Sequence, residues 1–150
     1  MKKKLAEIIH GRPLYTVTKD ATVREVAELL ATHRIGAVPV VDNQRIVGIF
    51  SERDVIARVI VNGLDPAHTR MAEVMTRNPV VARSDESYQD CADHMRRLNI
   101  RHVPVVEDDR LVGMVSLRDI LWIDNKNKEE EISYLHDYIH APPPEWSLAE

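Results

Sequence analysis

The spacing of hydrophobic positions along the chain changes in a fixed order, and this order occurs twice. Apolar residues three and four positions apart begin at Val23 and again at Tyr88, which predicts an amphipathic helix in each place. Two short runs rich in β-branched residues follow each helix, as expected for strands joined by a polar turn. The strand pairs are expected at 37–41 with 46–50 and at 102–106 with 111–115.

A shift of 65 residues aligns the two copies without a gap. Of the 39 positions from Thr16 to Asp54, 13 are identical at this offset. The best-matched blocks are Val-Pro-Val-Val, at 38–41 and 103–106, and Gly-x-x-Ser-x-Arg-Asp, which begins at Gly48 and Gly113. Units of about 45 residues are too small to be stable alone, so we expect the two copies to share one core.

Capping patterns mark where the helices of each unit begin. Thr22 and Ser87 carry hydroxyls three residues before an acid, which is the pattern of a capping box at the start of the first helix. Ser51 and Ser116 also precede an acid by three residues, so a second helix is expected to begin at each of them.

The predicted fold class is α+β, with two tandem β-α-β-β-α repeats packed in pseudo-two-fold symmetry and a short helix at either end. The first strand of each repeat is expected at 15–17 and 80–82. Leu5, Ile8 and Ile9 would form the apolar edge of the N-terminal helix. The expected boundaries are an N-terminal helical segment at 1–13, repeat 1 at 14–61, a linker at 62–78 with a helical turn at 71–75, repeat 2 at 79–123, and a C-terminal helix with a Pro-rich tail at 124–150.

The C-terminal segment differs from the repeats. Ile132, Leu135 and Ile139 share one face of a helix expected at 129–139, after a charged run. A helix this short is marginal alone, so we expect it to dock on the domain or on a second copy. Pro142-Pro143-Pro144 is expected to end it.

Composition and charge exclude several classes of protein. The net charge of −4 argues against a partner bound by neutralising nucleic-acid phosphates. Glu7 interrupts the apolar run after the basic start, and no apolar stretch approaches the ~18 residues of a membrane span, so a cytoplasmic protein without a membrane partner is expected.

Few residues suggest metal or nucleophilic chemistry. Cys91, which is the single cysteine, can form no internal disulfide, and it aligns with the core position Val26, as a buried inert thiol would. His136 and His140 have metal-compatible spacing but lack a third ligand, so exposed histidines and no metal site are expected. No serine or cysteine has a readable base partner, and no catalytic residue is expected.

The duplicated Val-Pro-Val-Val and Gly-x-x-Ser-x-Arg-Asp blocks resemble the CBS domain, the repeat named after cystathionine β-synthase. A tandem pair over about residues 14–123 resembles a Bateman module, in the stand-alone form common in bacteria. The resemblance implies a non-catalytic regulatory module, an energy or metabolite sensor, that binds an adenosyl ligand between the repeats. AMP is the first expectation, with ATP, ADP, NAD or S-adenosylmethionine as others. A disc-like homodimer and an unknown downstream protein are also implied. A structural or protein-interaction module with vestigial nucleotide sites stays open as the alternative.

The resemblance also implies which residues contact the ligand. In the family, the aspartate of the second block holds the ribose, the serine and its neighbour reach ribose or phosphate, and adenine lies against strand backbone and apolar side chains. A helix start and a ribose-binding acid suit a nucleotide chemically. The expected repeat 1 site comprises Thr16, Val17, Thr18, Gly36, Ala37, Val38, Pro39, Ser51, Arg53 and Asp54. The expected repeat 2 site comprises Val80, Val81, Arg101, His102, Val103, Pro104, Ser116, Arg118 and Asp119.

A second role is open for the serine–aspartate pairs. Ser51 with Asp54, and Ser116 with Asp119, also fit a capping box with Asp in place of Glu. The two roles are compatible, because a cap in the free protein can exchange for a ligand contact.

The two expected sites are unequal. Gly36-Ala37 stands where repeat 2 has Arg101-His102, the position of phosphate-binding basic residues in the family, and Glu52 replaces Leu117. A carboxylate near a phosphate is unfavourable unless it is neutralised. We therefore expect the site at Asp119 to be the better anion site, unless the basic pair is simply a solvated surface.

Overall fold

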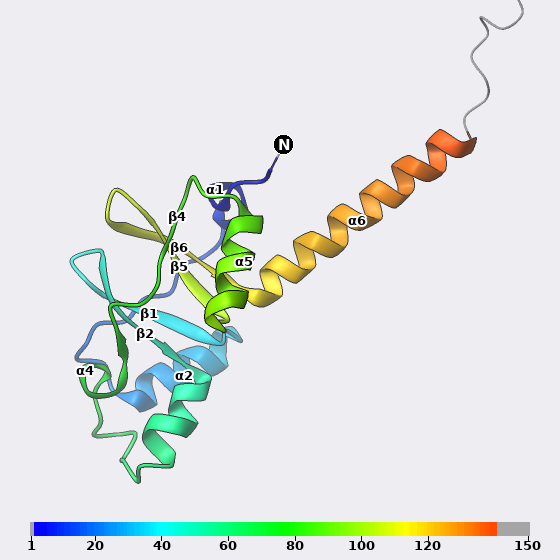
Figure 1. The fold of residues 1–150 in the computed structure, drawn as a ribbon. Coiled ribbons are helices and arrows are strands. Elements are labelled where there is room, and N and C mark those ends of the chain that lie inside the picture. The colour runs from blue at the N-terminus through cyan, green and yellow to red at the C-terminus, as the bar shows by residue number, and fades with distance from the viewer. Residues whose placement is uncertain (1, 141–150) are drawn as a thin grey trace, which may run out of the picture. The chain divides into compact units, whose positions relative to one another are not determined.

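A computed structural model describes residues 2–140, so the proline run at 142–144 lies outside the described residues. The chain divides into two units, Met1–Leu117 and Arg118–Glu150. The first unit holds two three-stranded sheets, one from each repeat, with a helix beside each sheet (Figure 1). This arrangement confirms the α+β class and the duplicated strand pairs.

The sheet of repeat 1 has the strand order β1-β2-β3. β1 and β2 pair antiparallel, with Ala37 opposite Ser51 and a bulge between Val40 and Val41. Asn43 and Gln44 turn the chain with φ of 49° and 67°, a left-handed geometry that suits a two-residue hairpin turn. The strands are Ala37–Asp42 (β1), Arg45–Ser51 (β2) and Thr76–Arg77 (β3).

The sheet of repeat 2 has the order β4-β5-β6 and the same central hairpin. β5 and β6 pair antiparallel with His102 opposite Ser116, and their bulge falls at the matching place. One backbone hydrogen bond joins the two sheets at their turns, from the N–H of Leu111 to the carbonyl of Gln44 at 3.0 Å. The strands are Ala82–Arg83 (β4), His102–Glu107 (β5) and Arg110–Ser116 (β6).

The first helix of each repeat begins where its capping residue predicts. α2 spans Val23–His33, and the Thr22 hydroxyl oxygen accepts from the N–H of Glu25 at 3.2 Å. α5 spans Tyr88–Leu98, and the Ser87 hydroxyl oxygen accepts from the N–H of Asp90 at 3.1 Å. Both helices end at a left-handed residue and bury an apolar face.

The expected first strands are shorter than predicted. In place of a strand at 15–17, only Val17 forms a parallel bridge, to Val40. In repeat 2 the strand β4 begins at Ala82, so Val80 and Val81 precede it. β3, by contrast, has no counterpart among the predictions. Each segment is only one or two residues long as a strand, too short to show a period of two in the sequence.

The second helices begin directly after Ser51 and Ser116, as predicted, but their continuations differ from expectation. After Ser51 the chain makes one α-helical turn, α3 (Glu52–Asp54), and then a π-helix, η1 (Val55–Ile60). After Ser116, α6 runs continuously over Leu117–His140 and covers the charged run, so the separate helix predicted at 129–139 is wrong. Lys126 and the run Lys128–Glu131 are good helix formers, which helps to explain why the helix does not end there.

Two short helices each pack against one repeat although they stand directly before the other repeat in the chain. α1 (Leu5–Ile9), at the N-terminus, lies against repeat 2, where the N–H of Leu5 donates to the carbonyl of Glu86 at 2.9 Å. α4 (Met71–Val74), in the linker, lies against repeat 1, where the N–H of Met71 donates to the carbonyl of Ala21 at 2.9 Å. Each helix start is thus tied to the loop before α5 or α2. The core around Phe50 accordingly combines residues of repeat 1 with Met71, Val74 and Met75 of the linker. Its repeat 1 members are Val23, Val26, Leu30, Val38, Val40, Phe50 and Val59.

Candidate functional site

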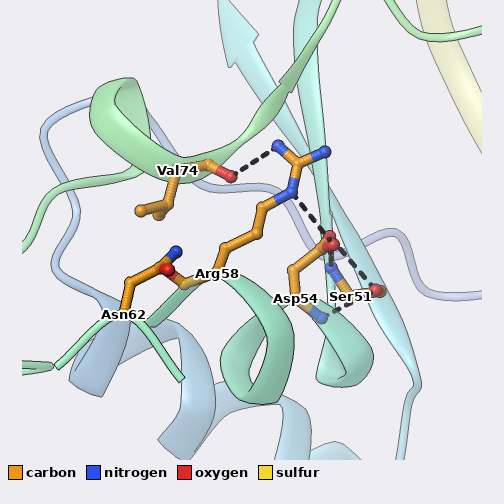
Figure 2. Close-up of polar contacts among 5 residues, drawn as sticks. All are labelled: Ser51, Asp54, Arg58, Asn62 and Val74. Carbon is orange, nitrogen blue, oxygen red and sulfur yellow. Dashed lines mark hydrogen bonds and ion pairs between the residues drawn. The ribbon is translucent and has the colours of Figure 1, made fainter. Parts of the chain in front are cut away.

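Both oxygens of the Asp54 carboxylate have partners on its own helical segment (Figure 2). Oδ2 accepts from the backbone N–H of Ser51 at 2.9 Å and from its hydroxyl at 3.1 Å. The Ser51 hydroxyl oxygen accepts in return from the N–H of Asp54 at 3.3 Å. Oδ1 lies 3.5 Å from Nε of Arg58. The pair therefore forms the capping box that the sequence left open as its second role.

Arg58 is a residue that the sequence analysis missed. Its Nη1 donates to the carbonyl of Val74 at 3.0 Å, which ties the helical segment after Ser51 to α4 (Figure 2). The i, i+4 spacing of Asp54 and Arg58 is the signal that predicts this ion pair. At the 65-residue offset the matching position in repeat 2 is Ile123, so this cation is particular to repeat 1.

The residues before β1 lie next to the residues after β2. The N–H of Glu52 donates to the carbonyl of Gly36 at 2.9 Å, and in repeat 2 the N–H of Leu117 donates to the carbonyl of Arg101 at 2.8 Å. The predicted phosphate-contact positions and the start of the second helical segment are thus joined in both repeats. Arg53 is exposed beside this junction.

Of the predicted adenine-contact residues of repeat 1, Val38 and Pro39 lie in β1, and the segment around Val17 runs along β1 on the side away from β2. The N–H of Val17 donates to the carbonyl of Pro39 at 3.2 Å, and the N–H of Val41 donates to the carbonyl of Val17 at 2.9 Å. Thr16 and Thr18, on either side of Val17, are exposed. The structure therefore brings Thr16–Thr18 beside Val38 and Pro39, while Ser51 lies on the opposite side of β1, across from Ala37. Ala37, Val38 and Pro39 themselves are buried.

The predicted residues of repeat 2 fall in both units. Val103 and Pro104 are buried in β5, Ser116 ends β6, and Val80 and Val81 are exposed before β4. Arg118 and Asp119 lie in α6 near its start, in the second unit.

One contact joins residues that were predicted for different sites. His102 of repeat 2 lies against Gly36 of repeat 1, where a Cβ would be 3.0 Å from Nε2 of His102. Gly36, just before β1, therefore makes room for His102, the first residue of β5.

Among residues 2–140, no three His, Cys, Asp or Glu side chains gather as a metal site would require, although the rings of His136 and His140 lie 4.3 Å apart. Nor does any helix described there have the length and apolar character to cross a membrane.

Comparison with known proteins gives two matches to the family described as "CBS domain", at residues 5–61 and 71–125. The CBS domain-containing protein YhcV of Bacillus subtilis is 32% identical over 125 residues, which cover 83% of this chain and 88% of that protein. The chain therefore belongs to the CBS domain family, and it carries two CBS domains in tandem.

Solved structures of CBS domain pairs share this fold. The CBS domain pair of protein MJ0100, in complex with 5′-methylthioadenosine and S-adenosyl-L-methionine, has a TM-score of 0.75 and 31% identity, over 85% of this chain and 99% of that one. The CBS domain protein PAE2072 from Pyrobaculum aerophilum, complexed with AMP, has a TM-score of 0.72 and 33% identity, over 78% and 89%.

Proposed function

We propose that this protein is a non-catalytic regulatory module that binds an adenosyl ligand in the clefts between its CBS repeats. The observation that carries the proposal is the tandem pair of CBS domains, whose fold matches pairs that hold AMP, 5′-methylthioadenosine or S-adenosyl-L-methionine. Binding regulates only if the ligand prefers one arrangement of the repeats over another, so the module would act as an energy or metabolite sensor read by a downstream protein.

The repeat 1 site is proposed as the weaker of the two. Asp54 already accepts from Ser51 and pairs with Arg58, so a ribose diol must displace these partners to bind its carboxylate. Repeat 2 has Arg101 and His102 where repeat 1 has Gly36 and Ala37, so its site offers hydrogen-bond donors for a phosphate that the repeat 1 site lacks. We propose Asp119 as the principal ribose-binding residue.

AMP is proposed as the preferred ligand, before ATP, ADP, NAD and S-adenosylmethionine. Arg101 and His102 stand just before the Val-Pro of repeat 2, and both can donate hydrogen bonds to a phosphate. Arg101 is exposed and His102 is half-buried, so a ligand reaches the arginine without unfolding the strand.

A second function is favoured by one observation. The Asp54 carboxylate is satisfied within the chain, as it would be in a vestigial site that serves only to cap a helix. A structural or protein-interaction module would need no adenosyl ligand at either site.

A thermal-shift panel with AMP, ADP, ATP, NAD and S-adenosylmethionine tests the proposed function. A ligand at ~100 times its dissociation constant stabilises the protein by ~2.7 kcal/mol, and each kcal/mol raises the Tm of a chain this size by ~2–4 °C. We expect a rise of several degrees with AMP and none with uridine 5′-monophosphate, which shares the phosphate but not the adenine. An unchanged Tm with all five ligands would favour the interaction module.

A further inference from the structure

Two charged or ionisable side chains from different repeats border the same small space at Gly36. A Cβ on Gly36 would lie 3.0 Å from Nε2 of His102 and 3.6 Å from Oε1 of Glu52. The imidazole comes from the start of β5 and the carboxylate from α3, directly after β2. Glycine leaves this space open, so an imidazole of one repeat and a carboxylate of the other can approach each other there.

The arrangement is one-sided, although the two repeats are related by sequence. The counterparts of Gly36 and Glu52 in repeat 2 are Arg101 and Leu117, so a carboxylate stands only on the side of repeat 1. Glu52 is held in place through its backbone, whose N–H donates to the carbonyl of Gly36 at 2.9 Å, while its side chain is exposed. A solvent-accessible carboxylate is thus placed beside the histidine that repeat 2 contributes.

We propose that Glu52 determines ligand specificity by competing with a ligand's phosphate for His102. A carboxylate and a phosphate both accept hydrogen bonds from an imidazole. A protonated, positively charged imidazolium stabilises the negative charge of either group. A carboxylate this near to His102 therefore lowers the affinity for phosphorylated adenosyl ligands and leaves unphosphorylated ones unaffected. This inference rests on the proposed function, in which His102 contacts the phosphate.

Isothermal titration of AMP and of 5′-methylthioadenosine, which has no phosphate, tests the competition. In Glu52→Gln we expect AMP to bind about fivefold more tightly, the size of an exposed charge interaction, and 5′-methylthioadenosine to bind within twofold of wild type. Glu107→Gln, at the far end of β5, makes the same change in net charge and should leave both affinities unchanged. An equal gain for both ligands would contradict the proposal.

The His102→Gln background separates competition from simple repulsion of the phosphate by Glu52. If the carboxylate acts through the imidazole, Glu52→Gln gains no AMP affinity once His102 is replaced. The same fivefold gain in that background would overturn the role of His102 and leave only through-space repulsion.

A measurement without ligand distinguishes failure of this inference from failure of the proposed function. We expect the imidazole resonances of His102 in the NMR spectrum of the full chain to shift in Glu52→Gln and to stay in place in Glu107→Gln. Unchanged resonances in both variants contradict an effect of Glu52 on His102. Absence of binding by wild type to either ligand contradicts the proposed function instead.

Discussion

Single residues fix where the helices begin, and most of these are readable from spacing. Thr22, Ser87 and Ser51 each cap a helix, as a hydroxyl three residues before an acid predicts. The ion pair of Asp54 with Arg58 follows from i, i+4 spacing as well. The approach of His102 to Gly36 has no local signal, because it depends on how the two repeats face each other in space.

Cys91 tests the expectation of a buried, inert thiol. Its side chain is 1% exposed, which confirms the burial, and desolvation raises the pKa of the thiol to about 11. Because the thiolate is the nucleophile, we expect iodoacetamide at pH 8 to alkylate the native protein at least about 100-fold more slowly than the urea-unfolded chain. Native and unfolded rates within tenfold of each other would mean that the thiol is accessible.

The raised pKa of the Cys91 thiol also makes the free energy of unfolding depend on pH. A thiol whose pKa is raised in the folded state contributes stability that is fully present below its unfolded pKa of about 8.5. That contribution is lost as the pH rises toward 11, because the unfolded chain releases the proton first. We expect Cys91→Ala to show a smaller fall in the free energy of unfolding over this range, measured by urea titration.

At the scale of elements, the amphipathic helices and the strand pairs follow from periodicity, whereas the shortest elements do not. A single bridge at Val17 and the two-residue strand β3 (76–77) give no periodic signal. The sequence also does not show that α1 packs on repeat 2 and α4 on repeat 1, for a different reason. The segments 4–9 and 70–75 are similar, but similarity alone does not say which repeat each one completes.

A substitution at Gly48 tests whether α4 and the residue after it pack against repeat 1. A Cβ there would collide with the Met75 side chain, which follows α4. We expect Gly48→Ala to lower the free energy of unfolding by about 1–3 kcal/mol, the usual cost of overpacking a core. In a Met75→Ala background the added methyl still meets the Thr76 carbonyl at 3.1 Å but no longer the Met75 side chain, so the cost should be clearly smaller in urea unfolding. Equal costs in both backgrounds would place the collision elsewhere.

At the scale of the whole molecule, the duplication predicts a shared fold, and the structure shows the two sheets joined between Gln44 and Leu111. What the repeat pattern does not reveal is which surface a second copy would cover. We propose the homodimer interface on the segment after Ser51, where large apolar side chains are exposed on one helical stretch and its following turn. They are Ile56, Ile60, Val61 and Leu64.

Light scattering after gel filtration tests this interface. Ile60, 58% exposed, is expected to be covered in a dimer, so Ile60→Glu should yield monomers while wild type elutes as a dimer. Leu98→Glu, at the end of α5 and 46% exposed, is the matched control and should leave the dimer intact. Dissociation by Leu98→Glu alone would move the interface to α5.

We propose that an adenosyl ligand binds this protein and that repeat 2 provides the stronger site. Calorimetric titration of AMP into wild type, Asp119→Ala and Asp54→Ala tests both parts together. We predict measurable binding by wild type, at least a tenfold loss of affinity in Asp119→Ala, and a smaller loss in Asp54→Ala, because repeat 1 has Gly36 and Ala37 in place of the basic Arg101 and His102. No binding by wild type, or a larger loss in Asp54→Ala, would contradict it.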